Sequence, residues 1–242
     1  MVTSETVPFS KSGGLADVVG ALSSSIAGLG NNVKVFMPMY SFIENKGFKK
    51  TTEFLVDMLD HQEKAECVEK VVDGVSYVGL VNPYFTERKG IYGDTSFTPY
   101  SDNCARFLFF AKAVGEYIKA SNFKADIVHC HDWTAGFVPF YLKKQGIKAK
   151  TVFTIHNLAY QGDFSRYDAI LTGDEFDDKV MYGRGEAKRV NMLKAGVDTA
   201  TKITTVSPTY SKEIQTPELG CGLDWLLKQR EEDLVGIING ID

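Results

Sequence analysis

Residues 14–38 read GLADVVGALSSSIAGLGNNVKVFMP, and this stretch decides the fold. Its first half repeats apolar residues at the three- and four-residue spacing of an amphipathic helix. GLGN, residues 28–31, is typical of a helix end, and NVKVFMP, residues 32–38, is typical of a buried strand. With a short strand expected at 1–4, this makes a strand–helix–strand unit. The unit predicts a parallel sheet whose strands have a ligand crevice at their carboxyl ends.

The rest of the chain continues the alternation of strands and helices. Residues 52–60 and 64–82 predict an antiparallel insertion with a two-residue hairpin turn at Asp73-Gly74. Helices are expected at 103–120, 133–145, near 189–200 and at 209–215, and strands at 125–131, 149–156, 202–208 and 233–240. We therefore expect an α/β fold of the Rossmann-like, doubly wound type, with a mostly parallel sheet and a β-hairpin insertion.

Composition excludes several classes of function. The 242 residues are 44% hydrophobic, which is enough for a sizeable core. The net charge is −4 and no block of like charges occurs, so nucleic acid is not an expected partner. No run of 18 apolar residues and no leader pattern occurs, so we expect no membrane segment and a cytoplasmic location. The four cysteines form no CxxC pair, which favours a reducing compartment.

Lys11, Gly13 and Gly14 precede the first helix in the sequence KSGG. Glycine lets backbone approach an anion closely, a helix N-terminus offers free N–H groups, and a lysine adds a full positive charge. The same residues could simply form the turn that starts a helix, because their spacing matches neither the dinucleotide nor the P-loop pattern. These residues alone leave both interpretations open.

HCHDW, residues 129–133, lies at the end of a predicted central strand. His129 and His131 should share one face of the strand, where they could act as metal ligands or hydrogen-bond donors. A metal site would need a third ligand, and His129 could instead be a satisfied core histidine. Asp132 is expected in the crevice as a functional residue, as the N-cap of the following helix, or in both roles.

Two further loops carry polar side chains into the region of the expected crevice. TIHNLAYQG, residues 154–162, places His156 and Asn157 at a strand end, where they could bind a sugar hydroxyl or merely hold the loop together. ERKGIYGD, residues 87–94, offers Tyr92 for stacking on a ligand ring and Asp94 for hydroxyl groups. Loops of this kind are often only solvated connections.

These motifs occur in one order with LKAG at 193–196, TTVSPTY at 204–210 and GIINGID at 236–242. In this combination the chain closely resembles, over nearly its whole length, the N-terminal domain of bacterial glycogen synthases and plant starch synthases. The resemblance implies one half of a GT-B glycosyltransferase, which transfers glucose from ADP-glucose to the 4-hydroxyl at the non-reducing end of an α-1,4-glucan, with retention of configuration. It implies neither metal nor cofactor, because ADP-glucose is a substrate.

The resemblance also implies roles for individual residues. Lys11, Gly13 and Gly14 match the loop beside the diphosphate and glucose of the donor, and Asp17 matches a residue near the donor. Tyr92, Asp132, His156 and Asn157 match positions around the transferred glucose and the acceptor, and Asn239 matches the asparagine of an interdomain hinge. Lys11, Asp132 and His156 are the expected catalytic residues. Departure of the diphosphate creates negative charge, so cationic and N–H groups should face it.

The domain organisation follows from the same resemblance. We expect residues 1–238 to be the acceptor-side domain and 239–242 to begin the hinge, with the C-terminal nucleotide-binding domain absent and no activity in this fragment alone. MVTSE, residues 1–5, reads as the end of a strand, which also suggests a fragment. A plant protein of this kind would be plastidial. The alternatives are a non-catalytic glucan-binding or Rossmann-like module, and a metal-dependent hydrolase built on His129, His131 and His156.

Overall fold

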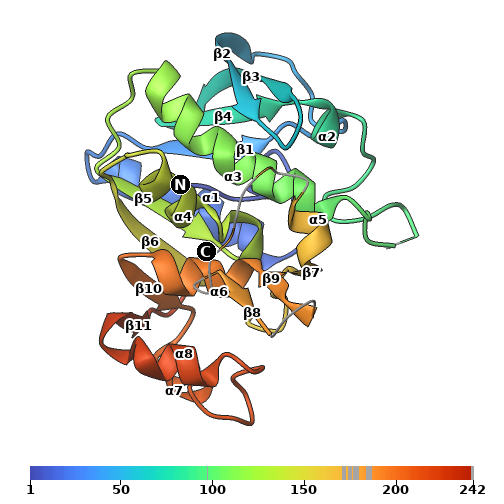
Figure 1. Ribbon diagram of the computed structural model, residues 1–242. Coiled ribbons are helices and arrows are strands. Elements are labelled where there is room, and N and C mark those ends of the chain that lie inside the picture. The colour runs from blue at the N-terminus through green and yellow to red at the C-terminus, as the bar shows by residue number, and fades with distance from the viewer. Residues whose placement is uncertain (97, 171–172, 174–175, 177–179, 184–186, 241–242) are drawn as a thin grey trace.

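The computed structural model describes residues 1–96, 98–170, 173, 176, 180–183 and 187–240. It is an α/β structure in which helices lie against a mostly parallel sheet (Figure 1). Among these residues no helix is long and apolar enough to cross a lipid bilayer. The predicted fold class is confirmed, and the differences below concern single elements.

The N-terminal residues join the two halves of the sheet. Val2 forms parallel bridges with Phe36 in β1 (Lys34–Pro38) and with Cys130 in β5 (Ile127–His131). The backbone N–H of Val2 donates to the carbonyl of His129 at 2.7 Å. The strands that come first in the chain lie on the β1 side of this segment, and the strands that come later lie on the β5 side. The strand order therefore reverses here. In open α/β sheets such a reversal is where ligands bind, beyond the carboxyl ends of the strands.

The first half of the sheet contains the predicted hairpin. Its order is β1, β4 (Val75–Val81), β3 (Gln62–Val72) and β2 (Lys49–Asp57). Asp73 and Gly74 connect β3 to β4 with φ angles of 49° and 79°, as a two-residue hairpin turn requires. β4 pairs in parallel with β1, whereas β3 pairs antiparallel with both of its neighbours. The expected insertion is therefore continuous with the main sheet, and its last strand belongs to the parallel part.

The second half of the sheet is entirely parallel. It contains β5, β6 (Lys150–Ile155), β10 (Lys202–Thr205) and β11 (Leu234–Gly236). A small antiparallel sheet beside it contains β7 (Asp163–Ser165), β9 (Arg189–Asn191) and β8 (Met181–Tyr182). The helix predicted near 189 therefore begins at α6 (Met192–Thr199), because the three residues before it form β9.

The helices agree with the periodic segments in most places. α1 (Gly14–Gly28), α3 (Asn103–Ala120) and α7 (Pro208–Glu213) correspond to predicted helices. The helix predicted over 133–145 is divided into a 3-10 turn, Trp133–Ala135, and α4 (Val138–Lys144). Pro139 lies in the first turn of α4, where its missing N–H costs nothing. The shorter helices are α2 (Pro83–Thr86), α5 (Arg166–Ile170), α8 (Asp224–Gln229) and a 3-10 turn at Glu231–Asp233.

Right-handed crossovers decide which face each helix covers. The crossover through α1 leads from the N-terminal segment to β1, whereas those through α3, α4 and α6 lead in the opposite direction along the sheet. α1 therefore lies on one face, and α3, α4 and α6 pack together on the other (Figure 1). The core lies between the sheet and these helices, and α3 contributes the buried run Phe107, Leu108, Phe109 and Phe110.

Candidate active site

Glu5 organises the KSGG loop from beneath. It is buried, and its carboxylate accepts hydrogen bonds from the backbone amides of Ser12 and Gly13, the latter at 3.2 Å. The same carboxylate accepts from the Ser12 hydroxyl at 2.9 Å and from the Tyr92 hydroxyl at 2.9 Å. Glu5 thus joins the loop before α1 to the loop of Tyr92. Sequence reasoning missed this residue, although an acid between small residues at a strand end was a usable signal.

Gly13 and Gly14 face open space. Among the described residues, a Cβ atom added to either glycine would meet no heavy atom within 4 Å. Gly13 is the N-cap of α1 and has no side chain to occupy the first amides of that helix. Packing within the chain therefore gives no reason for glycine at these positions. What glycine does provide is an unobstructed approach to the N-terminus of a 15-residue helix.

Lys11 and Asp17 form an ion pair beside this opening. The Lys11 ammonium lies 2.8 Å from Oδ1 of Asp17, and the two side chains are 54% and 47% exposed. Exposed pairs of this kind contribute only about 0–1 kcal/mol. An anionic ligand can therefore compete with Asp17 for the lysine. Asp17 also stabilises α1, because a negative charge in the first turn complements the helix dipole.

Asp132 ties the ends of β5 and β6 together. Its Oδ1 accepts the backbone N–H of His156 at 2.8 Å and that of Asn157 at 3.5 Å. Its backbone has a φ of 55°, an uncommon value for a residue with a side chain. Asp132 occupies the N-cap position of the following 3-10 turn, but its side chain makes no capping bond there. Its hydrogen bonds instead hold the backbone of the TIHNLAYQG loop in place.

Burial changes the protonation of both side chains at this junction. It raises the pKa of Asp132 to about 7, with a smaller contribution from the charge of Glu5, while the two backbone amides oppose the shift. Burial lowers the pKa of His156 to about 4. At neutral pH the imidazole of His156 is therefore uncharged.

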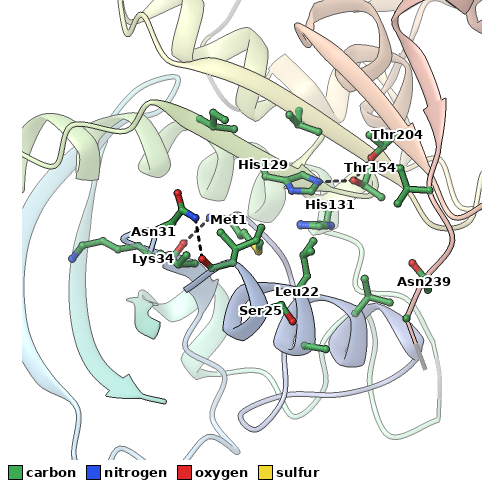
Figure 2. Close-up of a pocket in the computed structure, with 18 of the residues that line it drawn as sticks. Met1, Leu22, Ser25, Asn31, Lys34, His129, His131, Thr154, Thr204 and Asn239 are labelled. Carbon is green, nitrogen blue, oxygen red and sulfur yellow. Dashed lines mark hydrogen bonds between the residues drawn. The ribbon is translucent and has the colours of Figure 1, made fainter. Parts of the chain in front are cut away.

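The imidazoles of the two strand ends contact one another. Nδ1 of His131 lies 3.0 Å from Nε2 of His156, and the rings of His129 and His131 stack with centroids 4.2 Å apart. Nε2 of His129 lies 2.6 Å from the hydroxyl of Thr154, which lies 2.6 Å from that of Thr204 (Figure 2). The prediction that His129 and His131 share one face is confirmed.

The same contacts bear on the metal alternative. Nδ1 of His131 and Nε2 of His156 are hydrogen-bonded to each other, so neither of these two nitrogens is available to a metal ion. Within the part of the chain that the structure describes, no group of three or more His, Cys, Asp or Glu side chains is arranged to hold a metal ion. The contacts that the structure shows within the histidine cluster are hydrogen bonds and ring stacking.

Tyr92 connects the ERKGIYGD loop to the residues around Glu5. Besides Glu5, its hydroxyl contacts Oγ of Ser4 at 2.8 Å, and its ring lies 6.0 Å from that of Trp133. Lys11 and Tyr92 both line a cavity of about 320 Å³. The structure thus brings the KSGG and ERKGIYGD motifs to one site. Asp94 lines the same cavity, and its Oδ1 accepts hydrogen bonds from the backbone amides of Ser96 and Thr98.

Asn239 does not line the cavity of Lys11 and Tyr92. It lines, with Asp17, His129 and His131, a groove of about 990 Å³ between α1 and the sheet (Figure 2). This is the face of the second half-sheet opposite α4 and α6. Of the expected hinge, 239–242, residues 241–242 lie outside the described residues.

The fold and the site together define a class of protein. It is a doubly wound α/β protein whose crevice, at the reversal of strand order, combines an open helix N-terminus with a lysine and a histidine–aspartate cluster. A family model described as the starch synthase catalytic domain matches residues 1–229. The chain belongs to this family, and the resemblance read from the motifs is confirmed.

Individual relatives agree with the family. Glycogen synthase of Geotalea daltonii is 39% identical, with 100% of this chain and 51% of the relative covered. Glycogen synthase of Bacillus subtilis is 42% identical over 99% of this chain and 50% of the relative. The solved catalytic domain of starch synthase IV from Arabidopsis thaliana, bound to ADP and acarbose, is 29% identical with a TM-score of 0.86, over 100% of this chain and 51% of that one. The chain thus spans about half the length of the curated relatives it matches.

Proposed function

We propose that this chain is the acceptor-side half of a glycogen or starch synthase. Residues 1–238 form the domain, and 239–242 begin the hinge to a nucleotide-binding half. The two halves together transfer glucose from ADP-glucose to the 4-hydroxyl at the non-reducing end of an α-1,4-glucan, with retention of configuration. ADP-glucose is a substrate, and the reaction uses neither cofactor nor metal. We place the reaction in the cytoplasm, or in the plastid of a plant.

The open glycines before α1 are the observation that carries this proposal. Nothing in the described chain fills the space beside Gly13 and Gly14, and Lys11 lies next to it in a weak, exposed ion pair. Breaking the bond between glucose and diphosphate leaves negative charge on the diphosphate. Free helix N–H groups and a lysine stabilise that charge more as it grows. The relative bound to ADP and acarbose supports a nucleotide and a glucan as ligands.

A second group of polar side chains is available to bind the sugar. We assign Tyr92, Asp132, His156 and Asn157 to the surroundings of the transferred glucose and the acceptor. Asp132 is not a nucleophile in this account, because its Oδ1 is committed to two backbone amides. A retaining glycosidase would need a second carboxylate about 5 Å from the first. The leaving phosphate instead takes the proton of the acceptor hydroxyl.

A fusion enzyme tests the proposal. Residues 1–242 are followed by the second half of the Bacillus subtilis relative, and ADP release is measured with ADP-glucose and glycogen. We expect ADP release that depends on glycogen. Lys11→Ala should lower kcat by about a hundredfold, because one lost contact to developing charge typically has an effect of this size. Lys148→Ala, which removes an exposed lysine on the loop before β6, should match the wild type.

The outcomes separate the alternatives. A folded fusion enzyme that binds glycogen without releasing ADP would support the non-catalytic module instead. Full turnover in the Lys11→Ala variant would refute the assignment of the KSGG loop to the diphosphate. Equal losses of turnover and of glycogen binding would also count against it, because the donor site should affect chemistry more than acceptor binding.

A further inference from the structure

One contact of the histidine cluster is not explained by the proposed function. His131 is buried, with 0% of its surface exposed, and of its two ring nitrogens only Nδ1 has a hydrogen-bond partner among the described residues, Nε2 of His156 at 3.0 Å. Its other ring nitrogen, Nε2, is buried without a partner among the described residues. The hydrogen bond between His131 and His156 can run in either direction. Its direction determines which ring nitrogen of His156 carries the proton.

We propose that His131 is a positioning residue that holds His156 in the tautomer protonated at Nδ1, and so makes His156 a hydrogen-bond donor to substrate. The inference rests on the proposed function, because it gives His156 a defined role beside the transferred glucose. It assigns to His131 a role that neither the motif comparison nor the family match supplies.

The unpartnered nitrogen decides the direction of the bond. If Nε2–H of His156 donated, Nδ1 of His131 would be the acceptor and the proton of His131 would lie on its buried Nε2. That N–H would then have no acceptor, and an orphaned buried donor is rare and costs about 1–3 kcal/mol. If Nδ1–H of His131 donates, Nε2 of His131 has no proton. Burial of its unshared lone pair costs less than burial of an N–H group without an acceptor. The structure therefore favours donation from His131 to Nε2 of His156.

The surroundings keep both rings neutral and fixed. Burial lowers the pKa of His131 well below its usual value, with smaller contributions from His129 and His156. The ring of His129 stacks on His131 at an interplanar angle of 29° and is itself held by the hydroxyl of Thr154. A neutral imidazole has one proton, so a bond that fixes one nitrogen also fixes the other.

His156 is thus held from two independent directions. Asp132 holds its backbone N–H, and His131 holds its Nε2. Nδ1 of His156 lies on the opposite side of the ring and has no hydrogen bond within the described part of the chain. With the proton there, the half-buried side chain at the end of β6 presents a donor to a sugar oxygen rather than a base to its proton.

Nuclear magnetic resonance tests the tautomer without any activity. The 242-residue chain contains four histidines, so labelling histidine alone with ¹⁵N gives a spectrum that single substitutions can assign. Long-range ¹H–¹⁵N correlations distinguish protonated from bare ring nitrogens. We expect protonated Nδ1 and bare Nε2 in both His131 and His156 at neutral pH. Protonated Nε2 in His156, or two protonated nitrogens in either ring, would overturn the proposal.

Two substitutions test the effect on turnover in the fusion enzyme. His131→Asn keeps a side-chain N–H near the position of Nδ1, whereas His131→Leu removes the donor at similar volume. We expect His131→Leu to lower kcat by about 10–100-fold, the range found for groups that orient metal-bound histidines through a hydrogen bond, with KM changed less than about threefold. His131→Asn should retain kcat within about threefold and keep His156 protonated at Nδ1.

Controls keep the result interpretable. His61→Gln, which changes an exposed histidine on the far part of the sheet, should have no effect on kcat. Equal losses of kcat in His131→Asn and His131→Leu, or no loss in either, would refute the positioning role. If His131→Leu does not fold, the tautomer and turnover of His131→Asn decide. A wild-type fusion enzyme without turnover would refute the proposed function alone, because the tautomer is read from the 242-residue chain.

Discussion

Asp132 holds the backbone after β6, yet its burial reduces the stability of the folded state at neutral pH. Burial raises its pKa from 3.8 to about 7. Between about pH 4 and pH 7 the folded state therefore keeps a proton that the unfolded chain releases. The free energy of unfolding contributed by Asp132 falls as the pH rises through this range, and the loss is complete above about pH 7.

Asp132→Asn should remove that fall. Asparagine keeps an oxygen for the amides of His156 and Asn157 but does not ionise. We expect the free energy of unfolding of the variant, minus that of the wild type, to increase by about 2–4 kcal/mol between pH 4 and pH 8. Urea denaturation across this pH range measures it. A difference that does not change with pH would contradict the raised pKa of Asp132.

The variant must be compared with the wild type, because the buried histidines make the free energy of unfolding rise with pH, whereas Asp132 makes it fall. Burial lowers the pKa of His129 to about 3 and that of His156 to about 4. Their contribution to stability is present above about pH 6.5 and is lost as the pH falls through the lowered values. Both proteins contain these histidines, so the difference between the two curves isolates Asp132.

At the scale of elements, α6 packs against β6 at unusually close range. A Cβ added to Gly196 would lie 2.5 Å from the ring of Phe153 in β6. We expect Gly196→Ala to lower the free energy of unfolding by about 1–3 kcal/mol, because the ring or the helix must move. The matched control is Gly28→Ala at the end of α1, where an added Cβ meets nothing within 4 Å of the described residues.

Thermal unfolding of the two variants checks this packing. Gly28→Ala should leave the melting temperature unchanged or raise it, because alanine loses less backbone entropy in a helix. Equal melting temperatures for Gly196→Ala and the wild type would show that α6 can move away from Phe153 without cost. The LKAG motif would then have no packing reason for its glycine.

The elements that could be predicted from sequence are those with local signals. α1 and α3 have long periodic patterns, and Asp73-Gly74 has the residues that its turn needs. β9 could not be predicted, because Arg189–Asn191 is short and polar and exists by pairing with β7 and β8. The parallel pairing of β4 with β1 likewise depends on a non-local partner.

The candidate site likewise has features that the sequence predicts and features that depend on non-local contacts. The motifs at strand ends were predicted to meet because parallel strands end at one edge, and Asp132 and His156 do meet there. The bond between His131 and His156 depends on the register of β5 and β6, in which His131 pairs with Thr154. The role of Glu5 depends on the return of the Tyr92 loop, 87 residues later. Neither distance in space can be read from one sequence.

At the scale of the molecule, the order of strands places the candidate site. The N-terminal segment pairs in parallel with β1 and β5, so the loop before α1 and the loops after β5 and β6 lie at the same edge of the sheet. The helix that begins at this edge supplies N–H groups, and the strands opposite supply Asp132 and His156. In our account the diphosphate and the transferred glucose lie between them.

The most direct test is a crystal structure of the fusion enzyme with ADP. We predict that diphosphate oxygens lie within about 3.5 Å of the first free backbone N–H groups of α1, beginning at Gly14, and of the Lys11 ammonium, with the ion pair to Asp17 opened. A diphosphate bound beyond hydrogen-bond distance of all these groups, with Lys11 still paired to Asp17, would contradict the central claim.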